Sequence, residues 1–352
     1  MPTTPFEPPI DNTTSSTPSD PTFRTYNPAA AQTYLTHRPT YPARLLTYIL
    51  THHTATSSPL TPNPLTTLVD IGCGPGTATH QLAPTFQRAY GLDPGASMIA
   101  VARAAPPQQA DTHTAPPPRA KSGAAVVFAV SSAEELDETL TQPQPPLDVR
   151  AGSVDLITAA TAAHWFDMRR FYSAAARMLR PGGTLAMWCT GGWYCDVRRT
   201  PNGERCREVM HRFERETMRP WAQEGNRVCS GLYEELGLPW EVGVGEEWER
   251  NGYVWRTWNR EGEIEQGGDG DGWLMPRDVS WEEARAMLGT ASVVSRWREQ
   301  HGESAEDGRI KDCVDAFLDE LRDVMRAGGG EVPQVIKGGL SVGLVLLKKK
   351  AR

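Results

Sequence analysis

The stretch Leu68-Val69-Asp70-Ile71-Gly72-Cys73-Gly74-Pro75-Gly76 decides the fold. It begins as a short apolar run, which predicts a buried strand, and it ends in three glycines at alternate positions. Glycine lets the backbone turn tightly and approach a ligand, because no Cβ stands in the way. The next segment, 77–82, is predicted to be a helix, and a helix N-terminus offers unpaired N–H groups to an anion. This order of strand, glycine loop and helix predicts a ligand site at the end of a parallel strand.

The alternation of strands and helices continues beyond the loop. Strands are predicted over 88–92, 125–130, 154–159, 184–189 and 339–347, and helices over 97–104, 168–179 and 311–326. Such alternation indicates βαβ units, and therefore an α/β fold with a doubly wound, mostly parallel sheet. Ligands are then expected at the carboxyl ends of the strands, where the glycine loop, Asp93, 131–134 and 160–165 are placed.

The remaining segments suggest four units. Residues 1–22 are poor in apolar side chains and are predicted to be a disordered tail. Residues 23–190 form the ligand-binding core, with N-terminal helices to about Thr36 and over 42–52. Residues 191–310 are read as helices and irregular segments that form a cap, and 311–352 supply a last helix and strand that complete the core. Two capping boxes, Ser132-Ala133-Glu134-Glu135 and Ser280-Trp281-Glu282-Glu283, predict helix starts.

Composition argues against several classes of function. The 352 residues carry a formal net charge of −7, whereas a protein that binds nucleic-acid phosphates needs a basic face. The sequence has no run of ~18–20 apolar residues of the kind that spans a bilayer, and residues 1–22 do not resemble a secretory signal. The six cysteines include no C-x-x-C pair, so no metal site is predicted. We therefore expect a cytoplasmic protein, a monomer or weak dimer, that acts on a small molecule.

The glycine spacing separates two classes of cofactor. A dinucleotide fold uses G-x-G-x-x-G, but the third glycine position here is Thr77, so an NAD-dependent oxidoreductase is disfavoured. The pattern D-x-G-x-G-x-G, followed by Asp93 17 residues after Gly76, resembles class I S-adenosylmethionine (SAM) methyltransferases. The resemblance implies a seven-stranded Rossmann-like sheet and SAM as cofactor. The resemblance places Asp93 at the ribose of SAM. It places five residues at the methionine part, namely Asp70, Gly72, Cys73, Gly74 and Gly76. The other residues that it places in the SAM site are Met98, Ser132, Ala133, Glu134 and Ala160.

Two further motifs resemble a narrower group, the fungal trans-aconitate methyltransferase-like proteins. Residues 158–167, Thr-Ala-Ala-Thr-Ala-Ala-His-Trp-Phe-Asp, are similar to its V-x-A-x-H-W-F-D segment, and residues 34–42 to its Y-x-x-x-R-P-x-Y-P element. At Thr161 the group often has Gln or Ser. The substrate side is therefore predicted to comprise Tyr34, Arg38, Tyr41, His164, Trp165 and Arg296.

The chemistry of these residues leaves the acceptor open. Arginine can hold a carboxylate in a bidentate manner, and an aromatic face attracts a sulfonium. A carboxylate acceptor is already ionised at neutral pH and needs no base, whereas a hydroxyl or amine would benefit from His164 as general base. The expected activity is methyl transfer to a carboxylate or hydroxyl oxygen of an aconitate-like acid or secondary metabolite. The alternatives are an N-methyltransferase and a non-catalytic regulatory or partner protein of the same fold.

Overall fold

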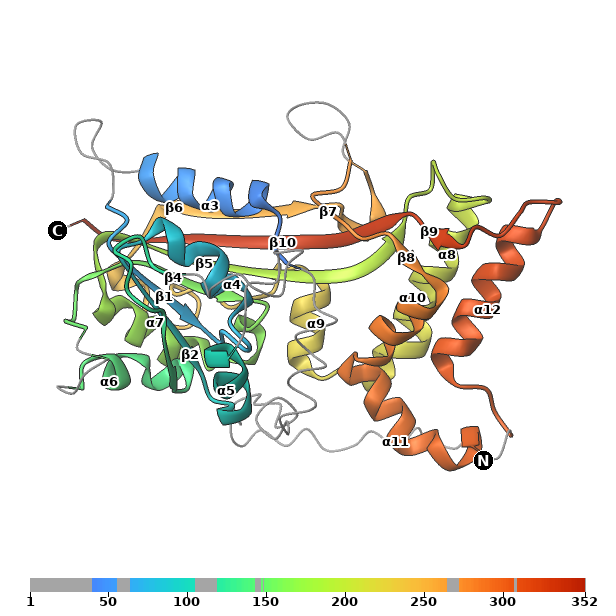
Figure 1. Ribbon diagram of the computed structural model, residues 1–352, viewed down its shortest axis with the longest axis horizontal. Coiled ribbons are helices and arrows are strands. Elements are labelled where there is room, and N and C mark those ends of the chain that lie inside the picture. Colours follow the sequence, from blue (N-terminus) through green and yellow to red (C-terminus); the bar gives the residue numbers. More distant parts are fainter. Residues whose placement is uncertain are drawn as a thin grey trace, which may run out of the picture.

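The computed structural model describes residues 40–55, 64–104, 119–142, 147, 149–264, 272–306 and 309–351, with 302–306 as backbone. The predicted tail, the predicted helix that ends near Thr36, and Tyr34 and Arg38 lie outside these ranges. The structure consists of an α/β core and a helical cap, joined by two long strands that run through both (Figure 1).

The core is an eight-stranded sheet with the order β3-β2-β1-β4-β5-β10-β6, in which short β7 also pairs with β10. Strands β1 to β5 are parallel to one another, and β10 is antiparallel to both β5 and β6. This confirms the predicted doubly wound, mostly parallel sheet. The bounds are β1 (Thr67–Ile71), β2 (Arg88–Asp93), β3 (Val127–Val130), β4 (Val154–Ala160), β5 (Leu179–Cys195), β6 (Trp248–Trp258), β7 (Met275–Pro276) and β10 (Gly338–Lys349).

Helices cover both faces of the sheet. They are α3 (Ala43–Ala55), α4 (Thr77–Leu82), α5 (Ala96–Ala104), α6 (Leu136–Leu140) and α7 (Met168–Met178). Successive side chains of a strand point to opposite faces, so Leu68 packs in the cluster that includes α3 and α4, whereas Val69 packs in the cluster that includes α6 and α7. Because both faces are buried, the strands are continuous apolar runs, which is why the sequence predicted them.

Strand β6 was not predicted, because its pattern is that of an edge strand. Most of its residues are half-exposed, and its sequence, Trp-Glu-Arg-Asn-Gly-Tyr-Val-Trp-Arg-Thr-Trp, contains no continuous apolar run. It pairs with β10 and forms one edge of the sheet, so a segment expected to be helical or irregular contributes a core strand.

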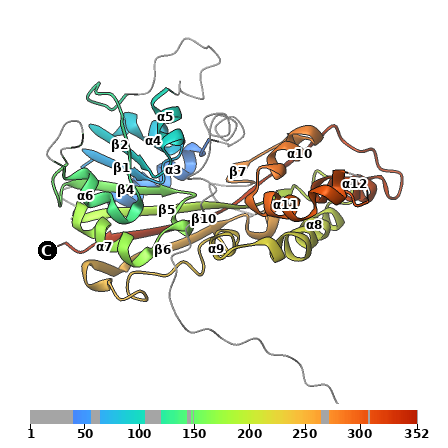
Figure 2. The same cartoon turned by 90° about the horizontal axis from the view of Figure 1, so that it is seen from below.

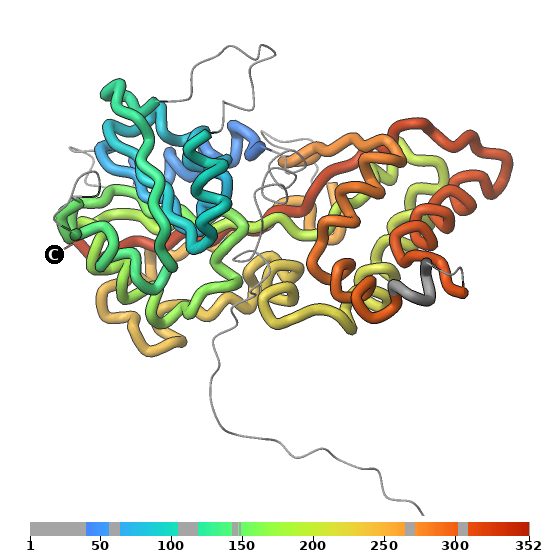
Figure 3. Tube along the Cα trace, turned by 60° about the horizontal axis from the view of Figure 1, so that its bottom comes forward, coloured from blue at the N-terminus to red at the C-terminus, as the bar shows by residue number. Residues whose placement is uncertain are grey.

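The cap contains α8 (Gly203–Arg212), the π-helical turn η4 (Phe213–Met218), α9 (Glu224–Ser230), α10 (Trp281–Gly289), α11 (Ser292–Glu306) and α12 (Cys313–Arg326). The far ends of β5 and β10 reach into this layer (Figure 2). The C-terminal helix α12 belongs to the cap, where Phe317 stacks on Phe213 with ring centroids 4.2 Å apart, while β10 returns to the core sheet (Figure 3). Two short strands, β8 (Val279–Ser280) and β9 (Val335–Ile336), pair with each other in the cap.

One of the two predicted capping boxes is confirmed. At Ser280 the side chain accepts from Glu283 N at 3.2 Å, and Glu283 Oε2 accepts from Ser280 N at 2.7 Å. The prediction at Ser132 is wrong, because Ser132 makes no capping bond with its side chain and the segment forms a short 3₁₀ turn over Ala133–Glu135. Glu134 instead accepts from the backbone N–H of Asp167 at 2.9 Å, a contact to a distant segment that the local pattern does not show.

Candidate active site

The glycine loop connects β1 to α4 and requires glycine. Gly72, Gly74 and Gly76 have φ angles of 61°, 53° and 86°, in the left-handed region that disfavours other residues. A Cβ at Gly72 would lie 2.5 Å from the Cβ of Ala162, whereas a Cβ at Gly74 would meet nothing within 4 Å. The loop therefore packs on the end of β4 at its first glycine and borders open space at its second.

Asp93 joins the end of β2 to this loop. Its carboxylate accepts from the backbone N–H groups of Gly74, at 2.9 Å, and Gly95, at 2.7 Å. Asp93 lines the pocket beside the loop, at the strand end where the sequence predicted a ribose-binding acid.

Asp70 does not line the pocket but lies beneath it. Its side chain is fully buried and accepts from the hydroxyls of Thr79, at 2.6 Å, and Thr158, at 2.7 Å. Burial raises the pKa of Asp70 to about 6, the negative charge of Asp93 adds to the rise, and the two hydroxyls oppose it. Asp70 thus ties the loop to α4 and β4 from behind. Gly76 is likewise outside the pocket lining.

The other predicted cofactor residues gather in one pocket. Those that line it are Gly72, Cys73, Gly74, Asp93, Met98, Ser132, Ala133, Glu134 and Ala160. Burial, together with the charges of Asp93 and Asp70, raises the pKa of the Cys73 thiol, which disfavours the reactive thiolate. These residues fit SAM, because a glycine turn beside open space and an acid at the end of β2 face the same cavity. Their contacts with SAM stay a prediction, and Asp70 and Gly76 are not part of this lining.

His164 and Trp165 line the pocket from the short turn after β4. His164 is buried, its Nδ1 lies 3.1 Å from the hydroxyl of Tyr233, and its ring packs against that of Trp165 with centroids 4.9 Å apart. The hydroxyl of Tyr41 lies 3.3 Å from Oγ1 of Thr161. Tyr41, His164 and Trp165 are therefore brought together as predicted from the sequence, although their roles in substrate binding stay a prediction.

Thr161 stands in an unusual backbone conformation. Its φ is 53°, which is unfavourable for a β-branched residue, and its N–H donates to the carbonyl of Trp188 at 2.6 Å. Leu232 and Tyr233 also have positive φ angles, 57° and 66°, and Leu232 lines the same pocket. Such conformations persist only where the surroundings enforce them, and they concentrate at functional sites.

Arg296 is outside the pocket lining, although the sequence predicted it on the substrate side. Its guanidinium donates to the carbonyl of Trp221 at 2.8 Å, to the side chain of Asn226, and to the hydroxyl of Ser292 at 3.4 Å. These contacts fasten α9 to the start of α11, so Arg296 supports the wall of the pocket.

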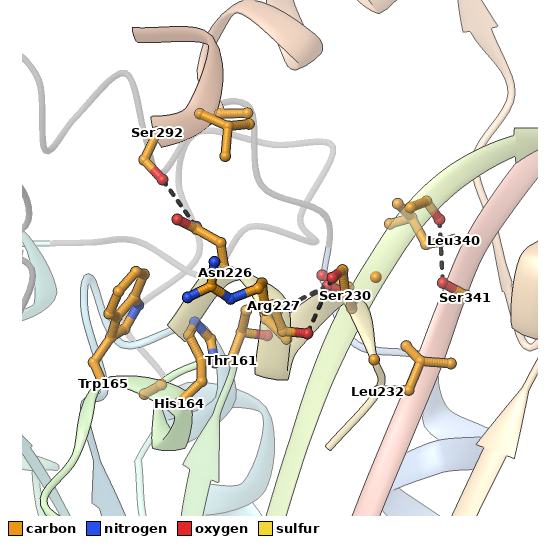
Figure 4. A pocket seen from close by; sticks show the side chains of 18 of the residues that line it. Thr161, His164, Trp165, Asn226, Arg227, Ser230, Leu232, Ser292, Leu340 and Ser341 are labelled. Carbon is orange, nitrogen blue, oxygen red and sulfur yellow. Dashed lines mark hydrogen bonds between the residues drawn. The ribbon is translucent and has the colours of Figure 1, made fainter. Parts of the chain in front are cut away.

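Sequence reasoning missed the residues that α9 contributes. Asn226, Arg227 and Ser230 line the pocket opposite Thr161, His164 and Trp165 (Figure 4). Asn226 donates to the hydroxyl of Ser292 at 3.1 Å. No sequence signal points to these residues, because α9 is a seven-residue helix whose position is set by long-range contacts.

The pocket as a whole is large and elongated. Its volume is about 760 Å³, and its lining includes the glycine loop. Figure 4 shows the part of the lining between Trp165 and Ser341. In the described ranges, no group of three or more His, Cys, Asp or Glu side chains is arranged to hold a metal ion. Nor does any helix described by the structure have the length and apolar character that a membrane crossing requires.

Comparisons with known proteins agree with this geometry. Residues 69–187 match the family model of a methyltransferase domain. The chain is 29% identical over 151 residues to CRG1 of Saccharomyces cerevisiae, described provisionally as an S-adenosylmethionine-dependent methyltransferase, over 43% of this chain and 42% of that protein. It is 28% identical over 199 residues to methyltransferase cfoB of Aspergillus candidus, over 56% of this chain and 54% of that protein. The chain spans about half the length of the curated relatives it matches.

A solved structure shows the same fold over most of the chain. It comes from Anaeromyxobacter dehalogenans, is described provisionally as a type II methyltransferase, and matches with a TM-score of 0.54 at 21% identity, over 89% of this chain and 98% of that one. The names of these relatives do not bear on the narrower trans-aconitate-like group, which stays a prediction. Residues 69–187 match the methyltransferase model, and the sheet order and the glycine loop with its acid at the end of β2 agree with that match, so the fold is the Rossmann-like fold that methyltransferases have.

Proposed function

We propose that this protein transfers a methyl group from SAM to an oxygen atom, a carboxylate or hydroxyl, of a small molecule. The observation that carries the proposal is the bond from Gly74 N–H to the Asp93 carboxylate, which joins the two cofactor motifs at the mouth of a cavity of about 760 Å³. When bound, SAM supplies a methyl group on a sulfonium, and its transfer to the acceptor oxygen leaves S-adenosylhomocysteine.

The residues of the chain act by binding and orienting. Asp93 accepts hydrogen bonds at the end of β2, and the glycine loop admits a ligand close to the backbone. His164 and Trp165 line the pocket on the side where the acceptor would bind. Holding an acceptor in line with the methyl group makes the reaction effectively unimolecular, which is a large part of what such a site can contribute.

The test uses the purified full chain with methyl-labelled SAM and a metabolite extract, followed by mass identification of the labelled product. Calorimetry of S-adenosylhomocysteine and of NAD accompanies it. We expect binding of the former without the latter, and a labelled ester or ether. Cofactor binding with no labelled product from any extract would support a non-catalytic protein of this fold, and a labelled amine would support the N-methyltransferase alternative.

The role of His164 distinguishes a carboxylate from a hydroxyl acceptor. With a carboxylate no proton leaves, so His164→Asn, which keeps a polar side chain beside Tyr233, is expected to lose at most about tenfold in rate. We expect this small effect. A loss of roughly 10²–10⁴-fold, with S-adenosylhomocysteine affinity unchanged, would instead make His164 the general base.

A further inference from the structure

The far end of the pocket contains a carboxylate that the proposed chemistry does not use. Glu214 lies on the π-helical turn η4 and lines the pocket together with Tyr194, which donates to its Oε2 at 2.7 Å. Short π-helical stretches are rare and occur frequently at functional sites. Among the described residues, no ion pair involves Glu214, and the hydrogen bond from Tyr194 engages one of its two oxygens.

Two glycines leave space for Glu214 and for its partner Tyr194. Gly192 of β5 lies against Oε1, so that a Cβ at this position would clash with that atom. Gly262, with φ of 77°, lies against Tyr194, where a Cβ would come within 2.8 Å of the tyrosine Cβ. Two close backbone approaches thus hold the pair at the wall of the cavity.

The nearby positive groups have other partners. Arg215 pairs with Glu261 at 3.3 Å, and Nε2 of His211 lies 3.0 Å from the carbonyl of Glu261. Burial raises the pKa of Glu214, as expected for a carboxylate without a directly bound cation. A ligand that brings a hydrogen-bond donor would complete the surroundings of this carboxylate.

Glu214 is remote from the cofactor end of the pocket. The end of β4 marks the cofactor end of the pocket. It lies beside Trp188 of β5, since Ala160 pairs with Trp188 and the N–H of Thr161 donates to the carbonyl of Trp188. Gly192, against which Oε1 of Glu214 lies, follows four residues later on the same strand, which corresponds to roughly 13 Å at ~3.3 Å per residue. The lining of the pocket includes polar side chains of α9 and a set of apolar ones, several of them flexible methionines, namely Met210, Phe213, Met218, Met275, Met287 and Phe317.

We propose that the acceptor is an elongated molecule with an apolar section that binds Glu214 through a hydroxyl or ammonium group at the end remote from the methylated oxygen. This inference rests on the proposed function, since it takes the glycine-loop end as the cofactor side. The apolar side chains of the lining pack on the acceptor, and Glu214 selects its far end.

The experiment measures binding of three probes of equal chain length to the full chain saturated with S-adenosylhomocysteine. The probes are ω-aminododecanoic acid, dodecanoic acid and dodecanedioic acid. We expect the amino acid to bind about ten- to hundredfold more tightly than the diacid, the range for a charge-assisted hydrogen bond against a repelled carboxylate, with dodecanoic acid between them. Glu214→Gln should remove most of this difference, because it keeps the shape and a partner for Tyr194 but loses the charge.

Glu216→Gln is the matched control, since Glu216 is exposed on the same turn, and it should leave the order of affinities unchanged. If Glu214→Gln does not fold, Glu214→Asp shortens the reach and should reduce the preference. Equal binding of the amino acid and the diacid, a preference that survives loss of Glu214, or no binding of any probe would each overturn the proposal. Calorimetry of S-adenosylhomocysteine on every variant tests the proposed function separately, because that binding does not involve Glu214.

Discussion

Asp70 and Asp93 flank the same glycine loop, yet their surroundings give them different roles. Asp70 is enclosed and accepts from two threonine hydroxyls, whereas Asp93 faces the pocket and accepts from two backbone N–H groups. Asp70 supports the loop from below, whereas Asp93 lies on the side of the loop that faces the pocket. Each role leads to a prediction.

Asp93→Ala is expected to weaken binding of S-adenosylhomocysteine by about ten- to hundredfold, because it removes charged hydrogen bonds worth roughly 1.5–3 kcal/mol each. Calorimetry on the full chain measures this. Asp323→Ala is the control, since Asp323 pairs with Arg326 on the surface of α12. Unchanged affinity in a folded Asp93→Ala protein would contradict the assignment of the ribose site.

Asp70→Asn is expected to change how stability depends on pH. The pKa of Asp70 is raised from 3.8 to about 6, so the native state binds this proton more tightly than the unfolded state does. The contribution of Asp70 to stability is therefore complete below pH 3.8 and is lost as the pH rises through about 6, a difference of about 3 kcal/mol.

The variant should lack this pH dependence, because an amide does not titrate. Denaturant unfolding of both proteins at about pH 4 and about pH 7 measures the free energy of unfolding, and the wild type should lose more stability than the variant as the pH rises. Parallel curves for the two proteins would show that Asp70 does not titrate in this window.

At the scale of elements, helix α9 depends on its neighbours for its position. It has seven residues, too few for a stable isolated helix, and Arg296 fastens it to α11 through Trp221, Asn226 and Ser292. Because α9 carries Asn226 and Arg227 into the pocket, this fastening shapes the acceptor side without contact to the cofactor side.

Arg296→Ala is expected to lower the free energy of unfolding by about 1 kcal/mol, since partly buried acceptors lose their donor. It should raise the KM for the acceptor and leave the affinity for S-adenosylhomocysteine unchanged. Arg298→Ala is the control on the same helix, because Arg298 pairs with Asp312 and not with α9. An unaltered acceptor KM in Arg296→Ala would show that α9 holds its place without this residue.

At the scale of the whole molecule, β5 and β10 couple the core to the cap. Their pairing extends from Thr184 and Lys348 in the core to Cys195 and Gly338 in the cap, with one irregularity between Leu340 and Val342. Neither strand can separate in the cap without disturbing its continuation in the core sheet.

We therefore expect core and cap to unfold in one cooperative transition. Far-UV circular dichroism follows the helices of both parts, and tryptophan fluorescence reports on Trp188 and Trp248 in the core and Trp193 and Trp281 in the cap region. The two signals should give the same midpoint and the same fraction unfolded. Two separate midpoints would show that the cap unfolds independently.

The sequence by itself determined the doubly wound sheet and the cofactor side of the pocket. Strands buried on both faces must be apolar throughout, and a loop that turns with positive φ must contain glycine, so both leave local patterns. Asp93 could be predicted because it ends the strand next to the loop. Tyr41, His164 and Trp165 were predicted from resembling motifs, and the structure brings them together in one pocket.

Only the tertiary structure decided which side chains line the proposed acceptor side. Asn226, Arg227, Tyr194 and Glu214 are separated along the chain, and each reaches the pocket because β5, α9 and η4 converge there. The same folding turned Arg296 away from the pocket and placed Asp70 beneath the loop. Strand β6 could not be predicted from the sequence for a related reason. It is an edge strand that forms by pairing with β10, and its half-exposed residues leave no continuous apolar run. Local patterns record what a segment must bury, whereas long-range packing sets which side chains meet in a cavity.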